Sequence, residues 1–400
     1  MRRAIVLVID GWSAGYLSSY GTAWLETPAL NQLAAESVLV EHATVETLHL
    51  DQLYRSWFQA AHPLAPADGF DLAAQLAQVG VPLHLLTDEA LLRDAAGAFA
   101  LASAEFLPCQ EPQIAEHEDD TELARIFAVL CEWIGSESGD ELIWAHARGM
   151  AGAWDAPLDY RRSLAAEDDP DPPSYAIPPA SRPTRKLEPD ELLGLSQAYG
   201  GQVLLIDTLM EELLAAIHAL PVERQPLLIV TSSGGMPLGL HGQIGRDASL
   251  PLAIYANLTQ APLTMRLPGG ADGLTRLQGL SASSDLPATL LDWFAAAQPE
   301  RAIAQGRSLL QFDLPGRDRT LCVAGQELYL RTAAWGARVH GNQQCQLFGK
   351  PDDRWDVNDV ANRCPQITPL AIELAEQTRD AIAQGAAPPE LPEELTEPLS

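Results

Sequence analysis

Side chains capable of acid–base or metal chemistry follow several apolar runs of this sequence. Asp10 ends the run "AIVLVID", His146 ends "LIWAH", and Ser232 and Ser233 follow "PLLIV" and Thr231. Short runs of Val, Leu and Ile predict buried strands of a parallel sheet, whose carboxyl edge is where α/β proteins place their chemistry. A carboxylate there could hold a hard cation, and an imidazole could move a proton. Two serines followed by two glycines bring no charge to that edge.

Each ionisable candidate also has a plain structural interpretation. Asp10 could bind a metal, but an isolated Asp commonly caps a strand-to-loop turn, and one carboxylate does not hold a divalent cation. Asp51 could act as an unusual carboxylate nucleophile, or it could be an acid at the N-terminus of a helix that contains "LYRSWF". His241, in a glycine-rich loop, could point into a cleft or be simply solvated or hydrogen-bonded. The same alternatives apply to His146.

Two arginines could bind an anion. Arg55 and Arg246 could each face a sulfate in a bidentate hydrogen bond, although pairing with the abundant surface acids is the alternative. The acidic stretch "DDPDPP" lacks the glycine and the terminal Glu of an EF-hand, so we expect a solvated loop. The five cysteines are odd in number and have no C-x-x-C spacing, which predicts reduced packing residues and neither disulfides nor a zinc site.

The composition limits the classes of function. The 400 residues are 47% hydrophobic, which predicts a globular chain, and carry a net charge of −29. Such a charge makes the capture of nucleic acid or of an anionic membrane surface improbable. Because salt screens charge over ~8 Å, a local cationic pocket could still bind a small anion. No window reaches the ~20 apolar residues of a membrane span, and the first apolar run is too short for a signal peptide, so we expect a cytoplasmic protein.

Strand-like runs alternate with helical patterns over most of the chain. This alternation predicts βαβ units around a mostly parallel mixed sheet with helices on its faces. We expect an α/β domain over 1–315, with a Pro- and Asp-rich surface excursion at 155–191. Short antiparallel strands and a helix predict a smaller α+β subdomain over 316–385, followed by an acidic, flexible tail over 386–400. In the helix around Leu204, a 3.6-residue apolar stripe predicts core packing.

Four segments in the same order resemble the sulfatases of the alkaline phosphatase superfamily. They are "VLVIDGWSAGYLSSYGTAWLETPALNQLAAESVLVEHA", "WAHARGMAGAWDAPLDYR", "AYGGQVLLIDTLMEELLAAI" with "PLLIVTSSGGMPLGLHG", and "LYLRTAAWGARV" with "QLFGKPDDRWDVNDVANRCPQ". The resemblance implies an alkaline phosphatase-like sheet and hydrolysis of sulfuric or phosphoric esters. It also implies a formylglycine made from the Cys or Ser of a C/S-x-P-x-R motif, a divalent cation of the calcium type, and an assisting Lys and His.

The metal ligands implied by the resemblance are mostly missing. Asp10 stands at the first metal carboxylate, but Gly11 follows it, where many members carry a second. The "DH" pair of the family's "TSDHG" maps onto Ser233 and Gly234. A carboxylate ligand and its neighbour are thus replaced by a hydroxyl and a hydrogen atom.

The nucleophile is also missing. Counting back from Arg55 places Asp51 at the modifiable position, whereas counting back from "HP" at 62–63 places Leu50 there. Thr47, the nearest hydroxyl, fits neither register. Asp cannot become formylglycine, so neither register supplies the nucleophile.

The assisting groups have changed in the same way. The family's "PHGPW" histidine falls on Ala151, and the lysine expected beyond His241 is absent, with Gln243 and Arg246 nearby. Arg246 could replace the charge of the lysine but not its titration, because a guanidinium is effectively always protonated.

These losses predict a sulfatase-like protein without hydrolase activity. We expect no cofactor. Such a protein could bind a small anion, associate with itself, or pair with a catalytic paralogue. The alternative is an active metal-dependent hydrolase that rebuilt its site from Asp10, Asp51, His146 and His241 around a calcium-type cation.

Overall fold

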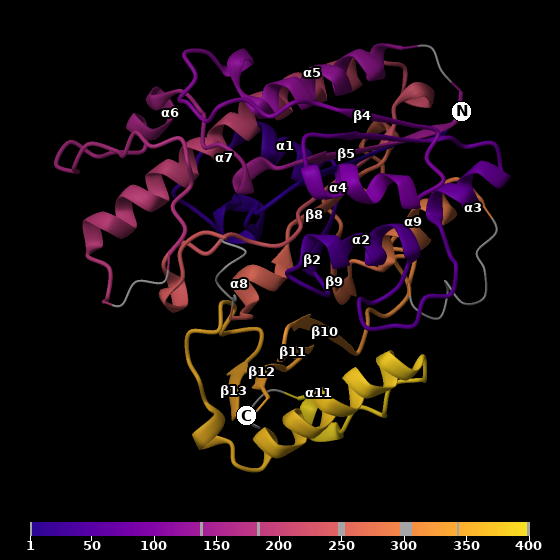
Figure 1. The fold of residues 1–400 in the computed structure, drawn as a ribbon, viewed down its shortest axis with the longest axis vertical. Coiled ribbons are helices and arrows are strands. Elements are labelled where there is room, and N and C mark those ends of the chain that lie inside the picture. Colours follow the sequence, from indigo (N-terminus) through magenta and orange to yellow (C-terminus); the bar gives the residue numbers. More distant parts are fainter. Residues whose placement is uncertain are drawn as a thin grey trace.

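The computed structural model describes residues 2–136, 139–181, 185–246, 253–296, 306–341 and 344–397. Within these ranges, nine strands form one mixed sheet flanked by helices, and four antiparallel strands form a second sheet beside it (Figure 1). This architecture confirms the expected α/β fold with a small antiparallel C-terminal part.

Strand β1 (Arg3–Ile9) lies in the middle of the large sheet. It pairs in parallel with β5 (Glu141–Ala147) on one side and with β6 (Leu227–Thr231) on the other. Every residue of the three strands is buried, which explains why their sequences are mostly apolar and do not alternate. The sheet order is β4-β3-β5-β1-β6-β8-β2-β7, with β9 paired to β2. The other strands are β2 (Val38–Thr44), β3 (Leu83–Thr87), β4 (Ser103–Phe106), β7 (Gln260–Ala261), β8 (Leu263–Arg266) and β9 (Arg276–Ala282).

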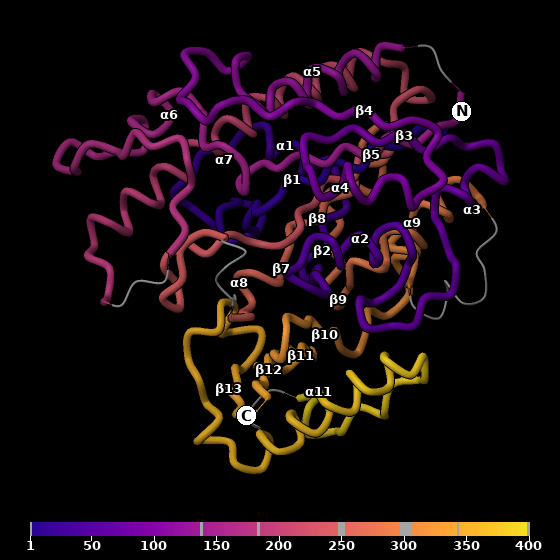
Figure 2. Tube along the Cα trace, viewed as in Figure 1, coloured from indigo at the N-terminus to yellow at the C-terminus, as the bar shows by residue number. Residues whose placement is uncertain are grey.

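Helices cover both faces of the large sheet (Figure 2). Because side chains alternate along a strand, Ile5 and Leu7 of β1 face one layer of helices, whereas Ala4 and Val6 face the other. The first layer comprises α1 (Pro28–Ala35), α5 (Glu122–Gly135) and α7 (Pro189–His218). The second comprises α2 (Leu50–Gln59), α3 (Leu72–Gln78), α4 (Ala90–Ala95) and α9 (Asp285–Trp293). The chemistry-bearing loops leave the sheet between these layers.

The long helix α7 confirms the predicted core stripe. Its buried apolar residues are Val203, Ile206, Leu209, Met210, Leu213, Leu214 and Ile217. The helix begins at Pro189, inside the range predicted as a surface excursion, because Glu188 and Glu191 form a capping box. A short helix α6 (Leu158–Arg162) also lies in that range. No helix in the described ranges, α7 included, is apolar over the length needed to cross a bilayer.

Two predictions about single segments have clear outcomes. Asp168 and Asp171 of the "DDPDPP" stretch are exposed, which agrees with a solvated loop. All five cysteines are free, and Cys322 and Cys364 are buried as expected. Cys109, however, is exposed at the surface, so its interpretation as a packing residue was wrong.

The C-terminal part consists of a four-stranded antiparallel sheet and one long helix. Its elements are β10 (Arg319–Ala324), β11 (Glu327–Thr332), β12 (Trp335–His340), β13 (Gln344–Gly349) and α11 (Ile367–Gln384). Gly325, with φ of 59°, makes the tight β10–β11 turn, and Gly385, with φ of 63°, ends α11. Within the predicted flexible tail, Leu395 is buried and its carbonyl accepts a hydrogen bond from the Thr332 hydroxyl at 2.9 Å. The tail is therefore partly anchored.

Candidate functional site

Asp10 and His146 meet at the carboxyl edge of the large sheet. Asp10 directly follows β1 and is 2% exposed, and His146 lies near the end of β5 and is 0% exposed. Nε2 of His146 lies 3.0 Å from Oδ1 of Asp10. Burial by itself would lower the pKa of His146, but the nearby carboxylates, Asp10 first and then Glu89 and Asp88, outweigh it, so that the pKa is raised. The carboxyl group and the imidazole form a close pair that is closed to solvent.

Helix α2 seals this pair on its outer side. The rings of Tyr54 and Trp57 each lie 5.7 Å from the His146 ring, in edge-on orientations, and both side chains are buried. Residues three apart on a helix share one face, which is why both rings reach the histidine. Sequence analysis missed this role, although the Tyr-x-x-Trp spacing in "LYRSWF" was its signal. With 2% of its surface exposed, Asp10 is not open to a substrate in this structure.

The two candidate nucleophile positions form the first turn of α2. The helix begins at Leu50, and Asp51 lies in its first turn with its side chain exposed. A carboxylate there interacts favourably with the helix dipole, so the structure agrees with the interpretation as a helix-start acid. Thr47 is fully buried, and its hydroxyl accepts a hydrogen bond from the backbone N–H of His49 at 3.2 Å. The exposed Asp51 does not join the buried pair of Asp10 and His146.

Arg55 has neither of its predicted roles. Its guanidinium donates to the carbonyl oxygens of Pro63 at 2.7 Å and Ala65 at 2.8 Å. The side chain therefore fixes the loop that follows α2. Among the residues that the structure describes, it has no ion pair with an acid and no contact with Arg246.

Neutral hydrogen bonds join the loops that follow β1 and β6. The backbone N–H of Trp12 donates to the Ser232 hydroxyl at 3.1 Å, and the N–H of Met236 donates to the Ser13 hydroxyl at 2.9 Å. All four residues are buried. In a metal site, these two loops would both turn charged oxygens toward one ion. Here, two serine hydroxyls join the loops.

The glycines at the ligand positions have no room for side chains. A Cβ on Gly11 would lie 3.0 Å from Cε of Met236 and 3.2 Å from Cβ of Met150. A Cβ on Gly234 would lie 2.4 Å from the carbonyl oxygen of Leu258. Both glycines also have positive φ, of 70° and 105°, which side chains disfavour. The space that ligands would need is filled by methionine side chains and backbone.

Arg246 brings a permanent positive charge to this edge. Its Nη1 donates to the Ser233 hydroxyl at 3.4 Å, and its Nη2 donates to the Gly235 carbonyl at 2.8 Å. Burial lowers the pKa of Arg246, and the nearby carboxylate of Asp10 opposes that shift. The guanidinium therefore lies within electrostatic range of Asp10. A dication would have to approach against this charge.

The donor set does not fit a divalent cation. Asp10 is paired with His146, Gly11 and Gly234 offer no side chain, and Ser233 already accepts from Arg246. Throughout the described ranges, no group of three or more His, Cys, Asp or Glu side chains is arranged to hold a metal ion. We therefore derive no catalytic step through a metal.

The side chain of His241 contacts residues outside the Asp10 site. Its ring stacks on Tyr255, with centroids 3.7 Å apart and planes 9° from parallel, and Nε2 lies 2.9 Å from the Trp355 carbonyl. Burial lowers the pKa of His241. The histidine thus links its loop to the C-terminal part of the chain and is hydrogen-bonded, as the structural alternative stated.

Several solved structures are similar in fold to this chain. A phosphonate monoester hydrolase of Agrobacterium radiobacter is 15% identical, with 96% of each chain covered and a TM-score of 0.76. The phosphonate monoester hydrolase of Silicibacter pomeroyi is 16% identical over 96% of this chain and 95% of its own, with a TM-score of 0.70. A 2-O GAG sulfatase is 12% identical over 96% of this chain and 92% of its own, with a TM-score of 0.69.

No protein-family model and no curated protein sequence matches this chain. The similarity to solved structures is therefore a similarity of fold. At these identities, the chain has the fold of sulfatases and phosphonate monoester hydrolases, which confirms the resemblance at that level.

Proposed function

We propose that this chain is a noncatalytic protein built on the sulfatase fold. The observation that carries the proposal is the closed pair of Asp10 and His146, 3.0 Å apart and sealed by Tyr54 and Trp57. An acid that must bind a cation and face a substrate needs an open coordination position. In this structure, Asp10 is instead paired with the buried imidazole of His146.

The environments of Ser233 and Cys322 support the same proposal. A nucleophilic hydroxyl needs an adjacent base, but the Ser233 hydroxyl faces the guanidinium of Arg246, which cannot accept a proton. Cys322 is fully buried in β10, and burial raises the pKa of its thiol well above the usual range. Neither group has the environment of an activated nucleophile.

The alternative of a rebuilt hydrolase site has less support. It requires Asp10, Asp51, His146 and His241 to act together. Only the first and third of these four meet, while Asp51 is exposed on α2 and His241 stacks on Tyr255. The four residues therefore lie in three separate parts of the structure.

Turnover of model esters tests the proposal. Purified protein is incubated with aryl sulfates, aryl phosphates and aryl phosphonate monoesters, with and without added calcium, beside the variant Asp10→Ala. We expect no hydrolysis above the buffer rate from either protein. Saturable turnover that Asp10→Ala abolishes would refute the proposal.

A further inference from the structure

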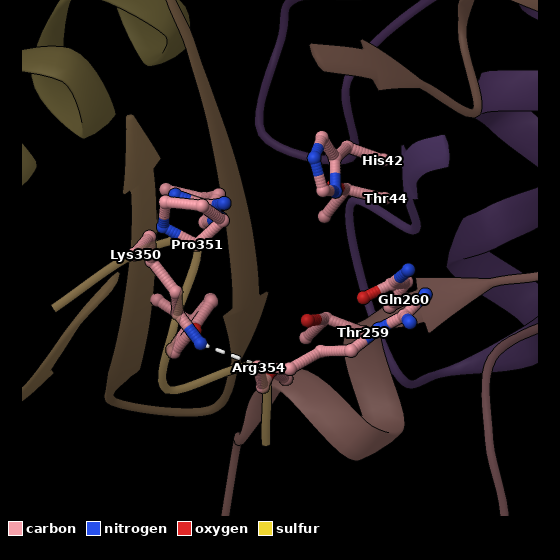
Figure 3. Close-up of a pocket in the computed structure, with 10 residues that line it drawn as sticks. His42, Thr44, Thr259, Gln260, Lys350, Pro351 and Arg354 are labelled. Atoms are coloured by element: carbon pink, nitrogen blue, oxygen red, sulfur yellow. Dashed lines mark hydrogen bonds between the residues drawn. The ribbon is translucent and has the colours of Figure 1, made fainter. Parts of the chain in front are cut away.

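A small cavity lies where the large sheet meets the C-terminal sheet (Figure 3). Side chains of β2, α8 (Ala256–Thr259) and β7 form one wall, and side chains of β11 and of the segment after β13 form the other. Its lining residues from the first wall are His42, Thr44, Ala256, Thr259 and Gln260. Those from the second wall are Tyr329, Arg331, Lys350, Pro351 and Arg354. The cavity shares no residue with the Asp10 site.

The charge around this cavity is opposite to that of the whole chain. The protein has a net charge of −29 and only 25 lysines and arginines, yet Arg331, Lys350 and Arg354 converge here. None of the lining residues is an acid. Behind the lining, Asp356 balances one charge, since its Oδ1 lies 2.6 Å from Nζ of Lys350, and Glu41 lies within electrostatic range of Arg354. Three cations and two acids leave the surroundings of the cavity with a net positive charge.

Arg354 has hydrogen-bond donors without acceptors. Its Nη1 donates to the carbonyl of Tyr20, but its Nε and Nη2 are buried with no partner among the described residues. Buried donors are nearly always satisfied, and an unsatisfied charged donor is especially unfavourable. Lys350, by contrast, donates to the carbonyl of Arg354 at 3.0 Å, the contact marked in Figure 3. These two donors of Arg354 therefore lack an acceptor from the described residues, and an anion in the adjacent cavity would supply one.

Neutral donors complete the wall. Burial, with the nearby charges of Arg331, Arg354 and Lys350, lowers the pKa of His42 to about 4. At neutral pH, its imidazole is therefore uncharged and can donate one hydrogen bond. Thr44 places a hydroxyl on the same side of the cavity, as Figure 3 shows. Charged and neutral hydrogen-bond donors therefore both line the cavity.

The size of the cavity selects the ligand. Its volume is about 30 Å³, which is room for about two waters at ~10–15 Å³ each. Two oxygens of a tetrahedral oxyanion, each about the size of a water molecule, would fill this space, and its remaining oxygens would lie outside the cavity. A planar, bidentate guanidinium is also well suited to its oxygens.

We propose that this cavity binds a tetrahedral oxyanion, phosphate or sulfate, either free or as the terminal group of an ester. The site goes beyond the proposed noncatalytic function and does not depend on it, because hydrolysis at Asp10 and binding here involve different residues.

Calorimetric titration of the full chain tests the site. Inorganic phosphate and sulfate are titrated at constant ionic strength, with sodium chloride as the reference salt. We expect saturable binding of one anion per chain, and a rise in Tm with phosphate that chloride does not reproduce. Phenyl phosphate is titrated in parallel. Binding at least as tight as that of phosphate would identify an ester end, and weaker binding would identify the free ion.

Matched variants locate the binding. Arg354→Met should weaken phosphate binding about tenfold or more, because it removes the two unpartnered donors. Arg162→Met makes the same charge change at an exposed side chain of α6 and should leave binding unchanged. Thr44→Val keeps the shape of the side chain and should weaken binding about threefold, which provides a second test if Arg354→Met does not fold. Absence of saturable binding by the wild-type chain, or equal weakening by Arg162→Met, would refute the proposal.

Discussion

At the scale of single residues, Asp10 and His146 lie 3.0 Å apart, and neither is more than 2% exposed. Removing two charges from water is unfavourable, and their mutual attraction roughly compensates only while both are present. Each side chain therefore depends on the other. In an enzyme, by contrast, a catalytic acid is commonly held in a position that reduces stability, and replacing it often stabilises the fold.

Single replacements of the pair should be strongly destabilising. We expect Asp10→Ala and His146→Leu each to lower the free energy of unfolding by about 3 kcal/mol, because each leaves an unpaired buried polar group. The double variant should lose less than the sum of the two single losses. Urea unfolding of the three variants measures this difference. An unchanged or raised stability of Asp10→Ala would show that the carboxylate is not held by the histidine.

Gly234 should not accept even a methyl group. A Cβ there would lie 2.4 Å from the Leu258 carbonyl, so Gly234→Ala should cost at least about 3 kcal/mol of stability. Gly242 is the matched control, since it also has positive φ but open space around its Cα. Gly242→Ala should cost only about 1 kcal/mol, the usual penalty for that backbone conformation. Similar losses in chemical denaturation would mean that the loop can shift to admit a ligand side chain.

The absence of metal-ligand side chains at Gly11 and Gly234 could be predicted from the sequence, but the groups that fill their place could not. Gly11 and Gly234 could be identified by position in the sequence. The packing of Met236 against Gly11, and of the Leu258 carbonyl against Gly234, joins segments far apart in the chain. Such contacts depend on tertiary structure and leave no local pattern. The stacking of His241 on Tyr255 escaped prediction for the same reason.

At the scale of elements, Asp207 of α7 fixes the start of α1. Its Oδ1 accepts a hydrogen bond from the backbone N–H of Leu30 at 2.8 Å, at the end of α1 where N–H groups lack helical partners. Burial raises the pKa of Asp207 from 3.8 to about 6. The folded chain therefore binds this proton more tightly than the unfolded chain does. Its contribution favours folding at acidic pH and is lost as the pH rises from about 4 to about 6.

Asp207→Asn should consequently stabilise the protein at neutral pH. An amide keeps an acceptor for the Leu30 N–H and has no charge to bury, so the gain at pH 7 should be on the order of 2 kcal/mol. The gain should shrink toward zero near pH 4, where the native acid is already protonated. Urea unfolding at the two pH values measures both. Glu212→Gln, on the exposed side of α7, should change little at either pH, and a pH-independent effect of Asp207→Asn would contradict the reasoning.

Elements with strong local patterns were predicted, and those defined by pairing were not. β1, β5 and β6 each contain an apolar run of four or more residues, and α7 and α11 carry a clear helical period. β12 contains Gly336 and Arg338 and was missed, because its strand character comes from antiparallel partners on both sides. β2 is likewise defined by its pairing, with β7, β8 and β9.

At the scale of the whole molecule, the C-terminal sheet is tied to the large domain. Cys322 and Tyr329 of that sheet belong to the same buried cluster as the apolar side chains of α2 and α9. The backbone N–H of Val323 donates to the Glu46 carbonyl at 2.9 Å, beside the start of α2. The sequence indicated a subdomain from 316 onward but gave no sign that its strands complete the core of the larger one.

The chain should therefore unfold as one unit. We expect tryptophan fluorescence and far-UV circular dichroism to report the same urea midpoint, because loss of the C-terminal sheet would expose part of the large core. A fragment of residues 1–315 should be insoluble or unfolded for the same reason. Two separate transitions, or a stable and soluble fragment, would indicate independent domains.

The metal content of the intact protein tests the central claim most directly. Protein purified without chelators, and equilibrated with calcium and then gel-filtered, can be measured by inductively coupled plasma mass spectrometry. We expect far less than one divalent cation per chain, because Asp10 is already paired with His146 and lies within electrostatic range of the cationic Arg246. One tightly bound dication per chain, lost in Asp10→Ala, would contradict that expectation and restore the case for a working hydrolase.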